Sequence, residues 1–137
     1  KDAVLPASDE SNDILNCKIA EYTKAVIQGR PNFHINLVIV VSPYCDCHGE
    51  NDAAIVPNVG MFASFDPVAL DVACADAVNA QPVIQNSKLG DCKEEERAAH
   101  HHDHFHSIFP ETNWESAIEH GVAIGIGNKE YELITVK

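Results

Sequence analysis

Three side chains with soft or borderline metal-binding chemistry lie within four positions of one another: Cys45, Cys47 and His48, with Asp46 between the two cysteines. In an extended segment, side chains two residues apart project to the same side, so the two thiols are placed to share one ion. Thiolate and imidazole ligands suit zinc or iron better than magnesium or calcium, which prefer oxygen. The cluster therefore predicts a zinc or iron site, or a redox role. The alternative is that the thiols are inert and merely packed, as free cysteines often are.

Further donors for such a site lie elsewhere in the chain. Asp52 belongs to the same polar segment and Asp71 to a later predicted helix, and both carboxylates can support or ligate an ion. In the His-rich tract at residues 100–106, His104 and His106 are candidates, because helical spacing would pair each with a histidine four residues earlier. The opposing interpretation of the tract is a solvated polar loop that binds transition metal only when metal is offered.

The elements that must position these residues follow from apolar periodicity. Residues 15–28 predict an amphipathic helix, which ends there because Gly29 and Pro31 follow. Residues 35–41 are almost continuously apolar, which is typical of an inner strand covered on both faces. The cysteine cluster comes directly after this strand. Residues 59–65 form a second predicted strand.

Cap signals place the later elements. Asp66 and Pro67 predict the start of a helix, with a capping carboxylate followed by a proline in the first helical position. Thr112 and Glu115 fit the capping box of a last helix. Residues 131–136 then predict a closing strand.

The alternation of helices and strands predicts an α/β fold with a layered, mostly parallel sheet and flanking helices, either complete or as a fragment of a larger domain. The 137 residues are the length of one domain, and we expect a single domain over residues 1–137. Within it, residues 1–12 are expected to form a frayed leader and residues 81–110 an irregular excursion.

Charge and composition exclude several function classes. The net charge of −12 predicts a surface that repels phosphate backbones and anionic lipids, so neither nucleic acid nor a membrane is expected as a partner. The longest apolar run is far shorter than the roughly twenty residues that cross a bilayer. The five cysteines are an odd number and fit no small disulfide framework, which favours a reducing cytoplasm.

Several segments taken together resemble the uncharacterised iron-sulfur-centre protein family, a domain of unknown function numbered three-six-two. They are Cys45-Asp46-Cys47, residues 55–60, residues 66–71, Trp114 and residues 125–133. The likeness corresponds to the C-terminal part of such proteins, in which ferredoxin-type C-x-x-C-x-x-C clusters come earlier in the chain. The resemblance therefore implies a 4Fe-4S cluster only in a longer parent chain, and not in these residues. It also implies an upstream ferredoxin-like segment or a redox partner.

Together these observations predict a cytoplasmic α/β domain, the C-terminal portion of an iron-sulfur-associated redox protein, that carries a metal site. The predicted ligands and supports are Cys45, Cys47, His48, Asp52 and Asp71. Two alternatives remain open. In one, a zinc or iron ion activates water in an enzyme, with Asp52 or Asp71 close to an open coordination position. In the other, the domain is not catalytic and its acidic surface meets a basic partner.

Overall fold

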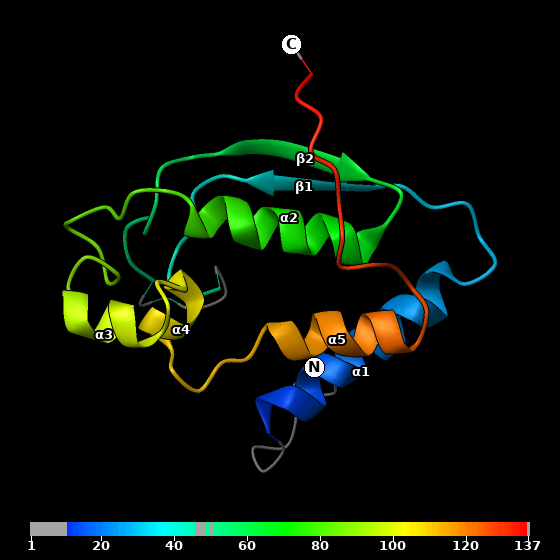
Figure 1. Ribbon diagram of the computed structural model, residues 1–137, viewed down its shortest axis with the longest axis horizontal. Coiled ribbons are helices and arrows are strands. Elements are labelled where there is room, and N and C mark those ends of the chain that lie inside the picture. Colours follow the sequence, from blue (N-terminus) through cyan, green and yellow to red (C-terminus); the bar gives the residue numbers. More distant parts are fainter. Residues whose placement is uncertain (1–10, 46–48, 50, 137) are drawn as a thin grey trace.

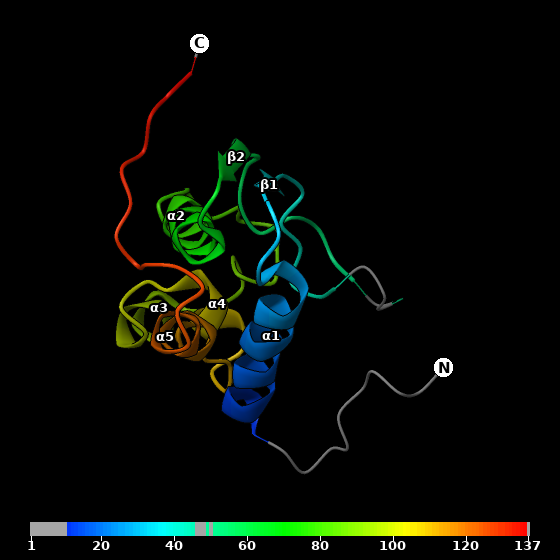
Figure 2. The same ribbon diagram turned by 90° about the vertical axis from the view of Figure 1, so that its right-hand side faces the viewer.

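The computed structural model describes residues 11–45, 49 and 51–136, so Asp46, Cys47 and His48 lie outside the described residues. The elements in chain order are α1 (Asn12–Ile27), β1 (His34–Val38), β2 (Gly60–Ser64), α2 (Pro67–Asn79), α3 (Glu94–Ala99), α4 (His104–Ile108) and α5 (Glu115–Ala123). The two strands lie on α2, α1 and α5 form a further layer beneath α2, and α3 and α4 lie at one end (Figures 1 and 2). None of the described helices is long and apolar enough to cross a bilayer.

The two strands form an antiparallel sheet, so the α/β class is confirmed only in its general sense and the predicted mostly parallel sheet is wrong. The pairing runs from His34 opposite Ser64 to Val38 opposite Gly60. Parallel neighbours need a crossover of a dozen or more residues, usually through a helix. Between β1 and β2 the described residues form no helix, and the chain turns back along the strand that it has just left.

One face of the sheet packs on α2 and forms the core. This face carries Asn36, Val38 and Phe62, and Val38 is buried. The facing helix is rich in small side chains, which allow its backbone to approach the sheet closely. The buried residues of α2 are Val68, Ala69, Leu70, Ala73, Cys74, Ala75 and Val78.

The opposite face of the sheet is exposed, which contradicts the prediction of a strand covered on both faces. Ile35, Leu37 and Met61 point to this side and have exposed fractions of 60%, 58% and 68%. Phe33 and Phe65 extend it at one end, with ring centroids 4.9 Å apart. We call these five residues the outer sheet face. A continuous apolar run cannot distinguish such a strand from one that is covered twice, because both lack polar residues.

Helix α1 confirms the first predicted helix but packs through a different face. It begins after Ser11, whose side chain accepts a hydrogen bond from the first turn, and it ends before Gly29, which has a φ of +70°. The helix packs against α5. The amphipathic pattern at residues 15–28 comes from apolar and aromatic side chains at intervals of three and four, and of these Ile19, Tyr22 and Val26 are instead exposed, with exposed fractions of 52%, 75% and 63%.

Helix α2 starts as predicted. The Asp66 Oδ1 accepts a hydrogen bond from the backbone nitrogen of Ala69 at 2.9 Å, and Pro67 is the first helical residue. The other carboxylate oxygen, Oδ2, accepts a hydrogen bond from the backbone nitrogen of Asn128 at 2.9 Å. One side chain therefore caps the helix and holds the segment that follows α5.

Two predictions for the last third of the chain are wrong. The capping box at Thr112 is not formed, because its hydroxyl donates to the carbonyl oxygen of Phe109 at 2.8 Å, and α5 has no side-chain cap. Residues 131–136 form no strand. The Tyr131 hydroxyl donates to the Asp76 carboxylate on α2 at 2.7 Å, which directs the C-terminal segment across the helix and on beyond the sheet (Figures 1 and 2).

Candidate functional site

The segment that carries Cys45 is a loop closed at its base by main-chain hydrogen bonds. The backbone nitrogen of Val59 donates to the carbonyl oxygen of Val38 at 2.9 Å, and that of Ile55 donates to the carbonyl oxygen of Val41 at 2.8 Å. These bonds join the two arms of the connection just beyond the ends of β1 and β2. The residues between them, 42–54, form what we call the cysteine loop.

The side chain of Asn51 ties the two arms of the cysteine loop together. Its Oδ1 accepts from the backbone nitrogens of Tyr44 and Asp52 at 3.1 and 3.0 Å. Its Nδ2 donates to the carbonyl oxygen of Tyr44 and to the Ser42 hydroxyl, both at 3.0 Å. We call these four bonds the Asn51 clamp. Cys45 comes directly after the clamped residue and is exposed.

The residue before Cys45 is also anchored to the body of the domain. The Lys88 Nζ donates to the Tyr44 hydroxyl at 2.7 Å. The same ammonium lies 4.3 Å from the ring centroid of Tyr44 and 4.0 Å from that of Phe109. The two rings meet edge to face, with centroids 5.2 Å apart. A cation over aromatic faces stabilises such a cluster, so the start of the cysteine loop has a fixed position.

The predicted metal ligands are only partly placed by the structure. Cys47 and His48 lie outside the described residues. Among the residues that are described, no three His, Cys, Asp or Glu side chains gather closely enough to hold a metal ion. Asp52 is exposed, and its Oδ1 accepts from the backbone nitrogen of Ala53 at 2.7 Å. The metal site at the cysteine loop therefore stays a prediction.

The His-rich tract is not one continuous helix. His101 and His102, between α3 and α4, have φ angles of +54° and +60° and interrupt the helical path. The predicted helical pairing of His104 and His106 with histidines four residues earlier is therefore wrong. His106 stacks instead on His100, with ring centroids 6.2 Å apart. The predicted excursion thus contains two short helices, α3 and α4, joined by a left-handed turn.

Both candidate histidines of α4 have structural partners. His104 is buried, and its Nε2 lies 3.1 Å from the carbonyl oxygen of Gln81, so this nitrogen carries the proton and Nδ1 is left without a hydrogen bond. The His106 Nδ1 lies 3.2 Å from the Asp103 carboxylate. Burial acts to raise the pKa of Asp103, but hydrogen bonds from Trp114, from His106 and from the α4 backbone outweigh it and lower the pKa. Asp103 therefore acts as an ionised cap for α4.

A second group of polar side chains converges on a cavity of about 370 Å³ between β1, α2 and α5. The polar residues at its walls are Asn16, Asn36, Asp71 and Cys74. Cys74 is buried, whereas Asp71 is exposed and lies at the mouth. Cys45 lines neither this cavity nor the neighbouring one. Asp71 and Cys45 therefore belong to different sites.

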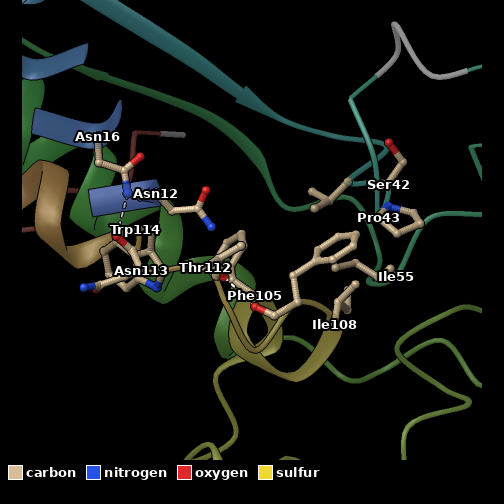
Figure 3. A pocket seen from close by; sticks show the side chains of 12 residues that line it. Asn12, Asn16, Ser42, Pro43, Ile55, Phe105, Ile108, Thr112, Asn113 and Trp114 are labelled. Atoms are coloured by element: carbon tan, nitrogen blue, oxygen red, sulfur yellow. Dashed lines mark hydrogen bonds between the residues drawn. The ribbon is translucent and has the colours of Figure 1, made fainter. Parts of the chain in front are cut away.

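The neighbouring cavity has a volume of about 320 Å³ and shares Asn16, Val41, Phe105 and Trp114 with the first. Its walls come from distant parts of the chain. In Figure 3, the asparagine side chains of α1 and the tryptophan at the start of α5 lie on one side of this cavity. Ser42 and the residues around it lie on the other side. The two cavities form adjoining hollows beneath the start of the cysteine loop.

The environment of the first cavity changes the acidity of two groups. Although Asp71 is exposed as a residue, partial desolvation of its carboxyl beside the cavity wall raises the pKa of that group, and the nearby His34 acts in the opposite direction. Burial also raises the pKa of the Cys74 thiol to about 11; the negative charge of Asp71 adds to this effect, and a hydrogen bond from Asn36 opposes it. The thiol of Cys74 is therefore protonated at neutral pH.

Several residues of the cysteine loop and of the cavities were not predicted from the sequence. Asn51 belongs to no recognised sequence motif, although the side chain of an asparagine in a polar loop often forms hydrogen bonds with the backbone. The proximity of Asp71 and Cys74 could have been predicted, because residues three apart on a helix share a face. Asn16 and Asn36 carried no signal, since their cavity is assembled from separate elements.

Residues 4–76, more than half of the chain, match the family model described as a domain of unknown function, DUF362. The match includes α1, both strands, the cysteine loop and most of α2. No curated protein and no solved structure is significantly similar to the chain. The match confirms the predicted domain of unknown function, and it includes three of the segments that predicted it, residues 45–47, 55–60 and 66–71. The chain therefore belongs to the DUF362 family.

Proposed function

We propose that the cysteine loop holds a zinc or iron ion, with Cys45 and Cys47 as ligands and His48 as a further donor, in an iron-sulfur-associated redox protein. The observation that supports the proposal is the position of Cys45. It is exposed directly beside a loop base that the main chain and the Asn51 clamp hold closed. The donor types fit a borderline or soft cation, since thiolate and imidazole ligands are typical of zinc and iron sites.

The closed base favours ion binding for an entropic reason. Bringing the ends of a flexible loop together costs conformational entropy, and that cost falls on folding rather than on binding when the ends are already tied. Asp52 follows the clamp residue and is exposed, so its second carboxylate oxygen is a candidate for support of the ion or its ligands. A bound ion would supply Lewis acidity or electron transfer. The loop residues bind and orient it.

The redox assignment follows from the family resemblance and from the two cysteines. In the proposed arrangement, this domain works with an upstream ferredoxin-like segment or with a separate redox partner that carries the 4Fe-4S cluster. Three residues are left out of the proposed site. Asp71 lies at a different cavity, and His104 and His106 are engaged by Gln81 and Asp103.

Metal analysis by mass spectrometry tests the proposal, on protein that has never been in contact with a metal-affinity resin. We expect close to one zinc or iron per chain in the wild type and a loss of that metal in the Cys45→Ser/Cys47→Ser double variant. A matched control, Cys17→Ser/Cys92→Ser, also removes two thiols and should keep the metal. Full metal content in the first double variant would overturn the assignment.

The pH dependence of occupancy provides an independent measurement. Thiolate and neutral imidazole bind metal only in their deprotonated forms, so occupancy should fall as the pH is lowered. The Asn51→Ala variant should shift this fall to higher pH, because the loop must then be ordered by the ion itself. An unchanged occupancy curve in Asn51→Ala would show that the clamp does not support the site.

A further inference from the structure

We propose that the cavity between β1, α2 and α5 binds a small organic cation, such as a primary amine carried on an apolar or aromatic body, with Asp71 as its counter-ion. This site is separate from the cysteine loop, because Cys45 does not line the cavity. The proposal therefore stands independently of the metal site.

The cavity has the size and the wall of a ligand site. Its volume of about 370 Å³ lies within the range of roughly 300–1,000 Å³ that is typical of small-molecule pockets. Most of its wall is apolar, formed among others by Val38, Val41, Val78, Phe105, Trp114 and Ile118. Such pockets bind the hydrophobic body of a ligand and use a few polar groups to fix its orientation.

The charge at the mouth selects a cation. Among the described residues, Asp71 is the only charged side chain that lines either cavity. Its carboxylate makes no hydrogen bond or ion pair with any other part of the chain that the structure describes. The two other carboxylates on or next to α2 are both engaged, Asp66 by Ala69 and Asp76 by Tyr131. The nearby His34 acts on Asp71 electrostatically but forms no hydrogen bond or ion pair with it. An ammonium group would supply such a direct partner, whereas an anion would be repelled.

The polar groups deeper in the wall favour a ligand that donates hydrogen bonds. The Asn16 Nδ2 already donates to the carbonyl oxygen of Asn113 at 2.7 Å and to the Ser116 hydroxyl at 3.0 Å. Both hydrogens of this amide are therefore engaged, and its oxygen is the group left to accept a hydrogen bond from a ligand. With the carboxylate of Asp71, this gives two acceptors for the N–H groups of an amine.

Two aromatic rings complete the site. Phe105 and Trp114 line both cavities, and their ring centroids lie 6.1 Å apart. The Trp114 indole nitrogen donates to the Asp103 carboxylate at 2.9 Å, which fixes the plane of the ring. Aromatic faces attract cations and stack on aromatic bodies. The ligand class that fits all of these features is an aryl or alkyl amine.

Three probe molecules with the same ring and different head groups test the proposal: 2-phenylethylamine, 2-phenylethanol and phenylacetate. Trp114 is the single tryptophan of the chain, so its fluorescence reports on the cavity directly, and calorimetry confirms each affinity. We expect saturable binding of the amine, binding of the alcohol that is about tenfold weaker, and no measurable binding of the acid. Equal affinities for amine and acid, or no response to the amine at millimolar concentration, would overturn the proposal.

A matched pair of variants separates a local counter-ion from the general negative charge of the protein. Asp71→Asn and Asp76→Asn remove the same charge from the same helix, one at the cavity mouth and one at Tyr131. We expect Asp71→Asn to weaken amine binding about tenfold and to leave alcohol binding unchanged. Asp76→Asn should change neither by more than about twofold. Equal effects of the two variants on the amine would refute the site.

Filling the cavity gives a readout that does not depend on charge. Ala75 is buried and lines the cavity, so Ala75→Val should reduce the affinity of both the amine and the alcohol. Circular dichroism shows whether the variant is folded. If the variant is not folded, a competition experiment with the wild-type protein shows instead whether the alcohol and the amine occupy the same cavity. Simultaneous, independent binding of the two molecules would contradict a shared cavity.

Discussion

Cys45 and Cys74 show how one fold places the same side chain in opposite environments, one exposed and one buried. Cys45 is exposed on a loop whose base is held by polar groups. Cys74 has an exposed fraction of 7%, and burial with the charge of Asp71 raises its pKa to about 11. A thiol reacts or binds metal as the thiolate. The comparison indicates that the cysteine loop keeps a thiol exposed to solvent, whereas the inner face of α2 buries a thiol and keeps it protonated.

The largest expected effect is a difference in thiol reactivity. In two metal-free variants that each retain one cysteine, Cys45 or Cys74, we expect Cys45 to react with a maleimide or disulfide reagent on the order of 100-fold faster at pH 8. A thiol with a pKa of about 11 is ionised in on the order of one molecule in a thousand at that pH, and burial also blocks access.

Unfolding provides the control for this measurement. In concentrated urea, both single-cysteine variants should react at the same rate, because the environment of each thiol is lost. If Cys74 reacts as fast as Cys45 in the native protein, the contrast between the two regions does not exist.

The second effect concerns the Asn51 clamp. Asn51→Ala removes four hydrogen bonds at the loop base and should lower the free energy of unfolding by about 1–3 kcal/mol, as measured by urea denaturation. Asn32→Ala is a suitable control, because Asn32 is a partly exposed loop residue whose side chain, within the described part of the chain, bonds only to its near neighbours Arg30 and His34. Equal losses in the two variants would mean that the clamp has no special role. The pKa of Cys74 should not change in either.

A smaller effect is expected within the Cys74 region. Asp71→Asn removes a negative charge that disfavours the thiolate, so the pKa of Cys74 should fall and its reactivity at pH 8 should rise by a factor of about 2–10. Burial remains the larger cause, so the pKa should stay above the usual value of about 8.5. The rate of a Cys74-only variant as a function of pH measures the shift. Asp76→Asn, on the same helix, should leave the rate profile unchanged.

The smallest effect is the contribution of Asp71 to stability as a function of pH. Its pKa is raised in the folded state, so ionisation opposes folding as the pH rises from the unfolded carboxyl value, about 3.9, through the folded value. Asp71→Asn should therefore gain stability relative to the wild type between acidic and neutral pH, by less than about 1 kcal/mol because the group is exposed and solvent screens it. Urea denaturation at pH 4 and pH 7 measures the difference.

Asp103 should affect stability with the opposite pH dependence, which the same urea denaturation at two pH values measures. Its pKa is lowered by its hydrogen bonds, so the ionised form stabilises the fold above the unfolded carboxyl pKa, and this contribution is lost as the pH falls through the folded value. Asp103→Asn should therefore be destabilised at pH 7, and the difference from the wild type should shrink on acidification. If the stability difference from the wild type changed with pH in the same direction for Asp71→Asn and Asp103→Asn, the causes assigned to the two pKa shifts would be wrong.

The local parts of this fold were predictable from sequence, and the parts that depend on distant contacts were not. The start of α2 at Asp66 and the end of α1 before Gly29 follow from signals within a few residues. The direction of the sheet was not predictable, because it depends on how residues 39–59 return the chain to β1. The apolar run at residues 35–41 is equally compatible with an inner strand and with a strand that has one exposed apolar face.

The same division applies to the two candidate sites. The spacing of Cys45 and Cys47 allowed the cysteine loop to be predicted as a candidate metal site, because its proposed sulfur ligands are close in sequence. The cavity could not be found in this way, because Asn16, Asn36 and Trp114 come from α1, β1 and the start of α5. The tertiary fold alone brings their side chains together.

The outer sheet face has a calorimetric consequence. The heat capacity of a protein rises on unfolding because apolar groups become hydrated, typically by about 12–15 cal/mol/K per residue. Ile35, Leu37 and Met61 are more than half hydrated in the native state already, so they add little to that increment. The outer sheet face should therefore contribute less to this increment than a buried apolar surface of the same size, and it flattens the curve of stability against temperature by a small amount.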